Sequence, residues 1–168
     1  MPGRRFDEFQ VGQVIRHTPT LHVTQEDNAA FCRLTLNNQP LHLDEAYART
    51  SSFGRIVVNG LYTMSAAVGV SVEDTTAGTL VANLGYDKVE HPNPVFPGDT
   101  LRFETEVKAA RPSSKPGRGV VTLEHRVHKA APQANPTSPS RFTAAPAASD
   151  GEADLLVCRF LRTVMVQA

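Results

Sequence analysis

Three short segments carry the residues whose types and spacing suit proton transfer and anion binding. They are Asn37-Asn38-Gln39-Pro40-Leu41-His42-Leu43-Asp44, then Phe53-Gly54-Arg55 continuing to Asn59-Gly60, and PVFPGDTL at residues 94–101. A histidine has a reference pKa of about 6.5, so His42 can take and give protons near neutral pH. A first-turn amide lacks a helical partner, so the N–H of Gly60 can bind a developing negative charge.

The loop around His42 is the best candidate for a functional site among the six histidines. Because the residue before Pro40 avoids helical angles, residues 36–44 are predicted to be extended and ordered. Asp44 is predicted to be the N-cap of a short helix, residues 45–50, rather than a base. The other histidines are interpreted as structural: His17, His22, His91, His125 and His128. The histidines lack the paired spacing of a zinc site, so no metal is assigned.

Two helices are expected to position these segments. Thr24 is a candidate N-cap for a helix that ends near Thr35, with Ala30, Phe31 and Leu34 on one apolar face. A second helix should begin at Asn59-Gly60, because Leu61, Met64, Val68 and Val72 follow helical spacing. The second helix is apolar nearly all round, which predicts burial on most sides.

The remaining elements alternate like strands. Candidate strands cover residues 13–23, 79–91, 99–110, 118–130 and 154–167. Pro19 suggests an edge position for the first of these, and one polar face predicts an antiparallel sheet covered on one side. The Pro/Ala/Ser-rich stretch at about 131–152 has little to bury and is predicted to be a disordered insert. The chain of 168 residues is therefore expected to be a single α+β domain.

Composition narrows the function classes. Lys plus Arg is 17 and Asp plus Glu is 17, a balance that argues against nucleic-acid binding. No apolar run is long enough to span a bilayer, and residues 1–10 resemble no signal peptide. Cys32 and Cys158 lie in apolar runs and are interpreted as small buried hydrophobes in a reducing compartment, which predicts a cytoplasmic location.

The three segments together resemble the MaoC-like dehydratases, also called R-specific enoyl-CoA hydratases, with the mesaconyl-CoA hydratase and β-methylmalyl-CoA dehydratase branch most similar. The likeness covers roughly residues 10–130 and the last strand. It implies a hot-dog fold, in which an antiparallel sheet wraps one long helix. In that family a loop with Asp-x-Asn-Pro-x-His activates water for addition to an enoyl-CoA, and His42 matches the histidine.

The resemblance implies further roles. His42 is expected to act as acid and base and Asn37 to orient the water, while the Gly60 N–H binds the thioester oxygen. Phe53, Arg55 and Asn59 are expected to contact an acyl-CoA substrate. Arg111, Lys115 and Arg118 are further candidates to meet the CoA phosphates, although basic residues near turns are common. CoA is part of the substrate, so no cofactor is expected, and a homodimer or an assembly of dimers is implied.

Position 37 departs from the family, because the aspartate is replaced by Asn37, whose amide cannot serve as a general base. Two other functions therefore stay open: a hot-dog acyl-CoA thioesterase, and a non-catalytic module that binds acyl-CoA or an acyl carrier. The pattern around His42 favours hydration over hydrolysis, whereas Asn37 favours the binding module.

Overall fold

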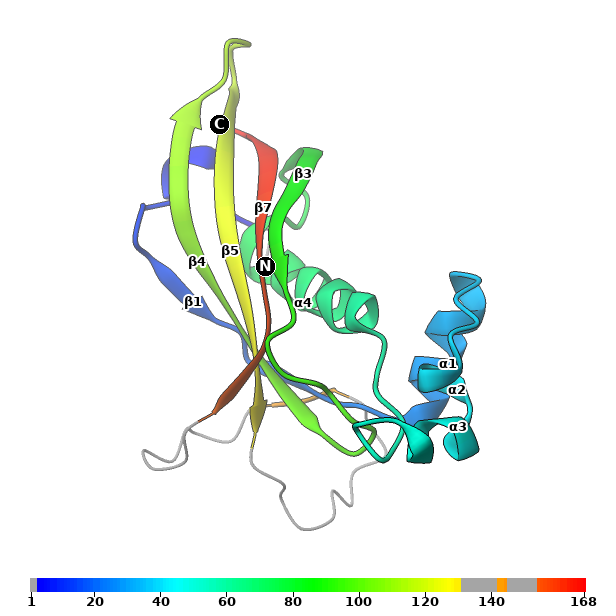
Figure 1. Cartoon of the computed structure of the whole chain (residues 1–168). Coiled ribbons are helices and arrows are strands. Elements are labelled where there is room, and N and C mark those ends of the chain that lie inside the picture. The colour runs from blue at the N-terminus through cyan, green and yellow to red at the C-terminus, as the bar shows by residue number, and fades with distance from the viewer. Residues whose placement is uncertain (1–2, 131–141, 145–153) are drawn as a thin grey trace.

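The computed structural model describes residues 3–130, 142–144 and 154–168. Four long strands lie side by side in one curved antiparallel sheet (Figure 1). They are β3 (Leu80–Glu90), β4 (Thr100–Pro112), β5 (Arg118–Ala130) and β7 (Leu155–Gln167). The four long strands predicted from alternation are confirmed, with bounds that differ by two residues at most.

Short strands extend the sheet beyond β4 in the order β3-β7-β5-β4-β2-β6, with β1 also paired to β4. The strand predicted at 13–23 is divided into β1 (Val14–Arg16) and β2 (Pro19–His22). The edge position predicted from Pro19 is wrong, because β6 (Phe142–Ala144) pairs with β2 on its outer side. Pro19 is tolerated because it is the first residue of its strand. Except for β6, the stretch predicted to be a disordered insert lies outside the described residues.

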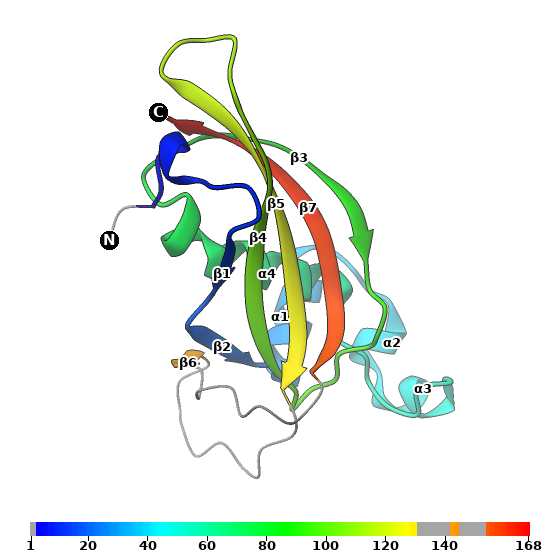
Figure 2. The same ribbon diagram turned by 90° about the vertical axis from the view of Figure 1, so that its left-hand side faces the viewer.

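The long helix α4 (Gly60–Thr75) crosses one face of the sheet (Figure 2). Its start at Asn59-Gly60 is confirmed, because the Asn59 side chain accepts a hydrogen bond from the Leu61 N–H. The helix packs on apolar side chains of β4, β5 and β7, among them Leu101, Phe103, Val127 and Phe160. This face contains the main hydrophobic core.

The prediction that α4 is buried on most sides is wrong for the single chain. Its buried residues form one stripe at every fourth position: Thr63, Ala67, Ser71 and Thr75. Leu61 is 55% exposed, and Ser65, Gly69 and Glu73 are also exposed. The reason is geometric, since a sheet that covers one side of a helix buries only the stripe that faces it.

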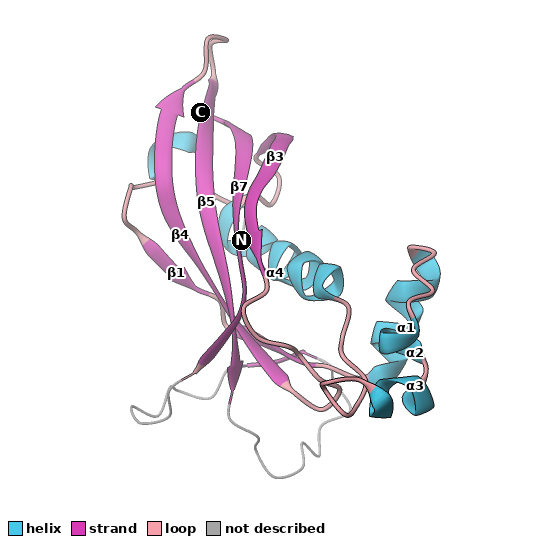
Figure 3. Cartoon of the chain, in the orientation of Figure 1, coloured by secondary structure: helices cyan, strands magenta, loops and turns pink. Residues whose placement is uncertain are grey.

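Three short helices form a group away from the sheet, at the N-terminal end of α4 (Figure 3). They are α1 (Gln25–Leu34), α2 (Pro40–Leu43) and α3 (Glu45–Thr50), and a 3-10 turn, η1 (Phe6–Glu8), precedes β1. The predicted Thr24 N-cap, the end of α1 near Thr35 and the Asp44 N-cap of α3 are all confirmed.

Two expectations about this group are wrong. The segment predicted to be extended contains a helical turn, because Pro40 takes the first helical position, where its fixed φ suits a helix. The apolar face predicted for α1 is not the buried one, since Leu34 is 82% exposed. Asn28 and Cys32 are buried instead, and the hydrogen bonds of Asn28, described below, compensate for its burial.

Both cysteines are buried and unpaired, as predicted. Burial raises the pKa of the Cys158 thiol to about 12, so this group is inert as a nucleophile. Within the described residues, no helix has the length and apolar character that crossing a membrane requires.

Candidate functional site

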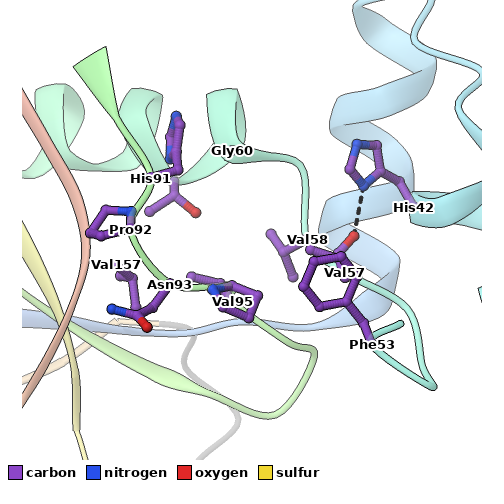
Figure 4. Close-up of a pocket in the computed structure, with 12 residues that line it drawn as sticks. His42, Phe53, Val57, Val58, Gly60, His91, Pro92, Asn93, Val95 and Val157 are labelled. Atoms are coloured by element: carbon purple, nitrogen blue, oxygen red, sulfur yellow. Dashed lines mark hydrogen bonds between the residues drawn. The ribbon is translucent and has the colours of Figure 1, made fainter. Parts of the chain in front are cut away.

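A pocket of about 370 Å³ lies where the N-terminal end of α4 meets the segment that follows β3 (Figure 4). Its walls combine apolar side chains with a few polar groups, the usual composition of a small-molecule site. The lining residues are His42, Phe53, Val57, Val58, Gly60, Thr63, His91, Pro92, Asn93, Pro94, Val95 and Val157. The pocket therefore brings together parts of all three segments singled out in the sequence.

His42 is held in one orientation by the strand-like segment before α4. Its Nδ1 lies 2.7 Å from the Val57 carbonyl oxygen, drawn as the dashed line in Figure 4. A carbonyl can only accept, so Nδ1 carries a proton and donates it. The atom left for proton exchange is therefore Nε2, which is the arrangement an acid–base histidine needs.

The backbone of His42 is fixed by α1. Asn28 Nδ2 and Gln25 Nε2 donate to the His42 carbonyl oxygen over 2.9 Å and 3.0 Å. Asn28 Oδ1 accepts from the Asn59 N–H over 2.9 Å, and Asn28 is fully buried. One buried amide thus joins the His42 turn to the start of α4, so that the histidine and the helix terminus keep a constant relation.

The first turn of α4 presents a free amide beside the pocket. Asn59 accepts from Leu61 N–H through its side chain and from Tyr62 N–H through its carbonyl, both over 3.0 Å. Among the described residues, no acceptor is found for the Gly60 N–H. Because Gly60 lines the pocket and the helix dipole is positive at this end, its amide can bind a negatively charged oxygen there.

His91, interpreted from the sequence as structural, also lines this pocket. Its ring lies directly over Gly60: a Cβ at position 60 would be 2.9 Å from His91 Cε1 and 3.0 Å from Nε2. The absence of a side chain at Gly60 therefore makes room for an imidazole. Burial lowers the pKa of His91, partly offset by a hydrogen bond to the Val157 backbone, so the surroundings favour the neutral ring.

The other predicted site residues have different surroundings. Phe53 lines the pocket and is 44% exposed. Asn37 is not among the lining residues, and its Oδ1 accepts from the Gln39 N–H over 3.1 Å. Asn59 is the buried cap of α4. Arg55 is exposed and is not among the lining residues, and its guanidinium carbon lies 3.7 Å from the centre of the Phe96 ring.

Residues with a clear geometric role escaped the sequence analysis. Asn28 and Gln25 were missed because periodicity registers apolar residues, and Thr63 was hidden inside an apolar helix. His91 stands directly before the PNPV segment, and its distance along the chain from Gly60 gives no sign that the two are in contact. Within the described residues, no cluster of His, Cys, Asp or Glu could hold a metal ion.

Comparison with known proteins places this geometry in a family. The model of the MaoC like domain matches residues 8–129. Mesaconyl-CoA hydratase of Cereibacter sphaeroides is 32% identical over 124 residues, which cover 74% of this chain and 36% of that protein. (R)-specific enoyl-CoA hydratase of Aeromonas caviae is 36% identical over 119 residues, covering 71% of this chain and 83% of that protein.

A solved structure agrees with these matches. A Mycobacterium tuberculosis protein described as having a double hot-dog fold superimposes with a TM-score of 0.75 and 25% identity, over 99% of this chain and 44% of that one. This chain spans only about a third of the first curated relatives that it matches, 36%, 30% and 35% of their lengths. With α4 packed on one face of its curved antiparallel sheet and with its matched segment of residues 8–129, the chain belongs to the MaoC-like family and has a hot-dog fold.

Proposed function

We propose that the chain is a hydratase/dehydratase that interconverts a 2-enoyl-CoA and a 3-hydroxyacyl-CoA. One observation carries the proposal: His42, oriented through Nδ1, and the Gly60 amide at the end of α4 line the same pocket. Addition of water to an enoyl thioester needs a proton-transfer group and a donor for the thioester oxygen. The relatives named mesaconyl-CoA hydratase and (R)-specific enoyl-CoA hydratase support the same reaction class.

In this proposal His42 transfers protons through Nε2, and the Gly60 N–H binds the thioester oxygen as negative charge builds on it. Phe53 contacts the acyl or pantetheine part, and the exposed Arg55, which lies in the chain between the lining residues Phe53 and Val57, suits the CoA phosphates. The Asn37 carbonyl oxygen is engaged by Gln39, which leaves its NH₂ group to orient a water molecule. The reaction needs no metal or redox cofactor, because CoA belongs to the substrate.

The test is an assay of the purified chain with crotonyl-CoA and mesaconyl-CoA, in which enoyl absorbance and free thiol are followed together. Loss of absorbance without thiol is the expected result. His42→Gln should lower kcat about 10²–10⁴-fold, the usual effect of removing one acid–base group. His128→Gln is the matched control, because His128 lies on β5 and outside the pocket lining. Thiol release would instead indicate a thioesterase.

A binding module is the second candidate, and the amide at Asn37 is the observation that favours it. An acyl-CoA module would show saturable binding of crotonyl-CoA in calorimetry without any change in absorbance. The diagnostic variant is Asn37→Asp, which supplies a carboxylate at this position. A rise in hydration rate in this variant would indicate a weakened catalytic site, whereas a rate of zero in both proteins would favour the module.

We also propose a homodimer that forms through β3. This strand is at the end of the sheet order, so one of its edges is unpaired within the described residues. It exposes several large apolar side chains: Leu80, Val81, Leu84, Tyr86 and Val89. Light scattering should give twice the monomer mass, and Leu84→Asp should give the monomer. Leu34→Asp, which changes an exposed leucine on α1, is the control that should leave the dimer intact.

The two unpaired cysteines support a cytoplasmic location.

A further inference from the structure

The pocket contains a second imidazole, and its position is as well defined as that of His42. His91 follows β3 directly, and its ring rests on the backbone of Gly60, where a Cβ would lie 2.9–3.1 Å from three of its ring atoms. Figure 4 shows His91 and His42 on either side of Gly60. The free amide at the start of α4 is therefore flanked by two histidines that belong to distant parts of the chain.

The state of the His91 ring is set by its surroundings. A hydrogen bond joins the ring to the Val157 backbone, and partial burial lowers its pKa. One ring nitrogen of the neutral imidazole therefore donates, and the other keeps a lone pair. Of the residues that line the pocket, His42 and His91 are the two with imidazole side chains, the side chain best suited to proton transfer.

A hydroxyl beside Gly60 lacks a partner. Thr63 lies three residues after Gly60, on the same side of α4, and it lines the pocket with 1% of its surface exposed. Its Oγ1 has no hydrogen-bond partner among the described residues. Because a buried hydroxyl without a partner costs about 1–3 kcal/mol, this atom calls for a water or a ligand in the pocket.

Building on the proposed hydratase function, we propose that His91 is the second catalytic proton-transfer residue of this site and replaces the carboxylate that position 37 lacks. His91 lies in the pocket and on the Gly60 amide, whereas Asn37 lies outside the lining and its Oδ1 is engaged by Gln39. In this proposal Thr63, which lines the pocket, takes the place of Asn37 and holds the reacting water against the free nitrogen of His91.

The proton balance of the hydration closes with two histidines. The water oxygen bonds to C3 as one water O–H bond breaks and its proton passes to the lone pair of His91. The electron pair of the double bond moves to C2, which takes the Nε2 proton of protonated His42. One proton then returns from His91 to His42 through solvent, so both residues regain their initial states. Dehydration follows the same steps in reverse.

The decisive variant is His91→Gln, because its amide NH₂ can still donate to the Val157 carbonyl but cannot transfer a proton. We expect kcat with crotonyl-CoA to fall about 10²–10⁴-fold, with KM changed less than about threefold. The acidic limb of the pH–rate profile, which reports the base that must be neutral, should disappear. Circular dichroism and thermal unfolding establish that the variant is folded.

A second variant tests the chemistry independently of shape. His91→Ala leaves a gap over Gly60. Free imidazole in the buffer should raise the kcat of this variant at least tenfold and leave the kcat of wild type unchanged. If His91→Gln keeps kcat within about threefold of wild type, or if imidazole restores nothing to a folded His91→Ala, the role of His91 is overturned and the hydratase function stands. A wild-type chain without hydratase activity would overturn both.

Discussion

The two ends of α4 each lie beside a pair of histidines, and the two pairs are built in opposite ways. At the N-terminal end, His42 and His91 line an open pocket. Toward the C-terminal end, His17 and His125 are 5% and 1% exposed. Thr105 Oγ1 joins the buried pair, at 2.8 Å from His17 Nε2 and 2.8 Å from His125 Nδ1. The chain of hydrogen bonds ends at Asp74, whose carboxylate accepts from His17 Nδ1 over 2.7 Å.

The comparison shows how one residue type takes two roles in a small domain. In the buried pair, Thr105 links the two rings and Asp74 accepts from His17, so these hydrogen bonds contribute to stability and specificity of packing, although His125 Nε2 has no partner among the described residues. In the pocket pair, the Nε2 of His42 and the free nitrogen of His91 have no partner among the described residues, so they are available to a ligand. Changes at one end should therefore alter stability, and changes at the other should alter activity.

The largest expected effect on stability comes from His17→Ala. This substitution empties a buried site and removes bonds to Asp74 and Thr105, which together should lower the free energy of unfolding by about 2–4 kcal/mol. Urea unfolding measures the loss. The rate of crotonyl-CoA hydration per folded molecule should stay within about twofold of wild type, and a large fall in this rate would break the separation between the two pairs.

Acidification should weaken the buried pair next. Burial, followed by Arg162 and His17, lowers the pKa of His125 to about 3, whereas the unfolded chain titrates near 6.5. Between these values the unfolded state binds one more proton, so the free energy of unfolding falls as the pH falls, by about 1.4 kcal/mol per pH unit. Above pH 6.5 this contribution is complete.

The corresponding measurement compares wild type with His125→Gln in urea at pH 7, 6 and 5. The difference in the free energy of unfolding between wild type and the variant should shrink at each step, because the variant lacks the imidazole that is protonated in the unfolded state. Parallel curves for the two proteins would show that His125 does not carry this pH dependence.

At the pocket end of α4, Gly60→Ala should lower the free energy of unfolding by about 1–3 kcal/mol, since the new methyl group would overlap the His91 ring. His91→Ala removes the obstacle, so the double variant should recover most of this loss. A double-mutant cycle in urea measures the coupling. Strict additivity of the two substitutions would mean that the ring and the glycine are not in contact.

The smallest expected effect on the free energy of unfolding concerns two threonines, one that joins the buried pair and one in the pocket. Thr105→Val interrupts the buried chain and should cost about 1–3 kcal/mol. Thr63→Val removes a hydroxyl that has no partner among the described residues, so it should not lower the free energy of unfolding and yet it should lower kcat. Equal losses of stability in the two variants would contradict the assignment of Thr63 to the pocket.

Period-two alternation was enough to predict the long strands, and capping residues were enough to predict where α1, α3 and α4 begin. These features depend on neighbours in the sequence, which is why they can be read from it. The edge position of Pro19 could not be predicted correctly, because it depends on a strand more than a hundred residues later in the chain.

The site was predicted in part for the same reason. His42 and Gly60 belong to recognisable local segments, and the structure brings both to one pocket. His91 and Asn28 act through contacts with residues about thirty positions away, at Gly60 and Asn59. Asn28 is also a buried polar residue, and patterns of hydrophobicity assign such residues to the surface.

The pairing of β6 with β2 has a consequence for how copies of the chain can associate. Among the described residues, the sheet order begins with β3 and ends with β6, the short strand of residues 142–144. The long strand at an edge of the sheet, which another strand can pair with, is therefore β3. An antiparallel contact between two β3 margins uses both of them at once. In the proposed homodimer, strand addition at β3 would therefore stop at two copies, and the long edge of the sheet would be protected from extending into fibrils.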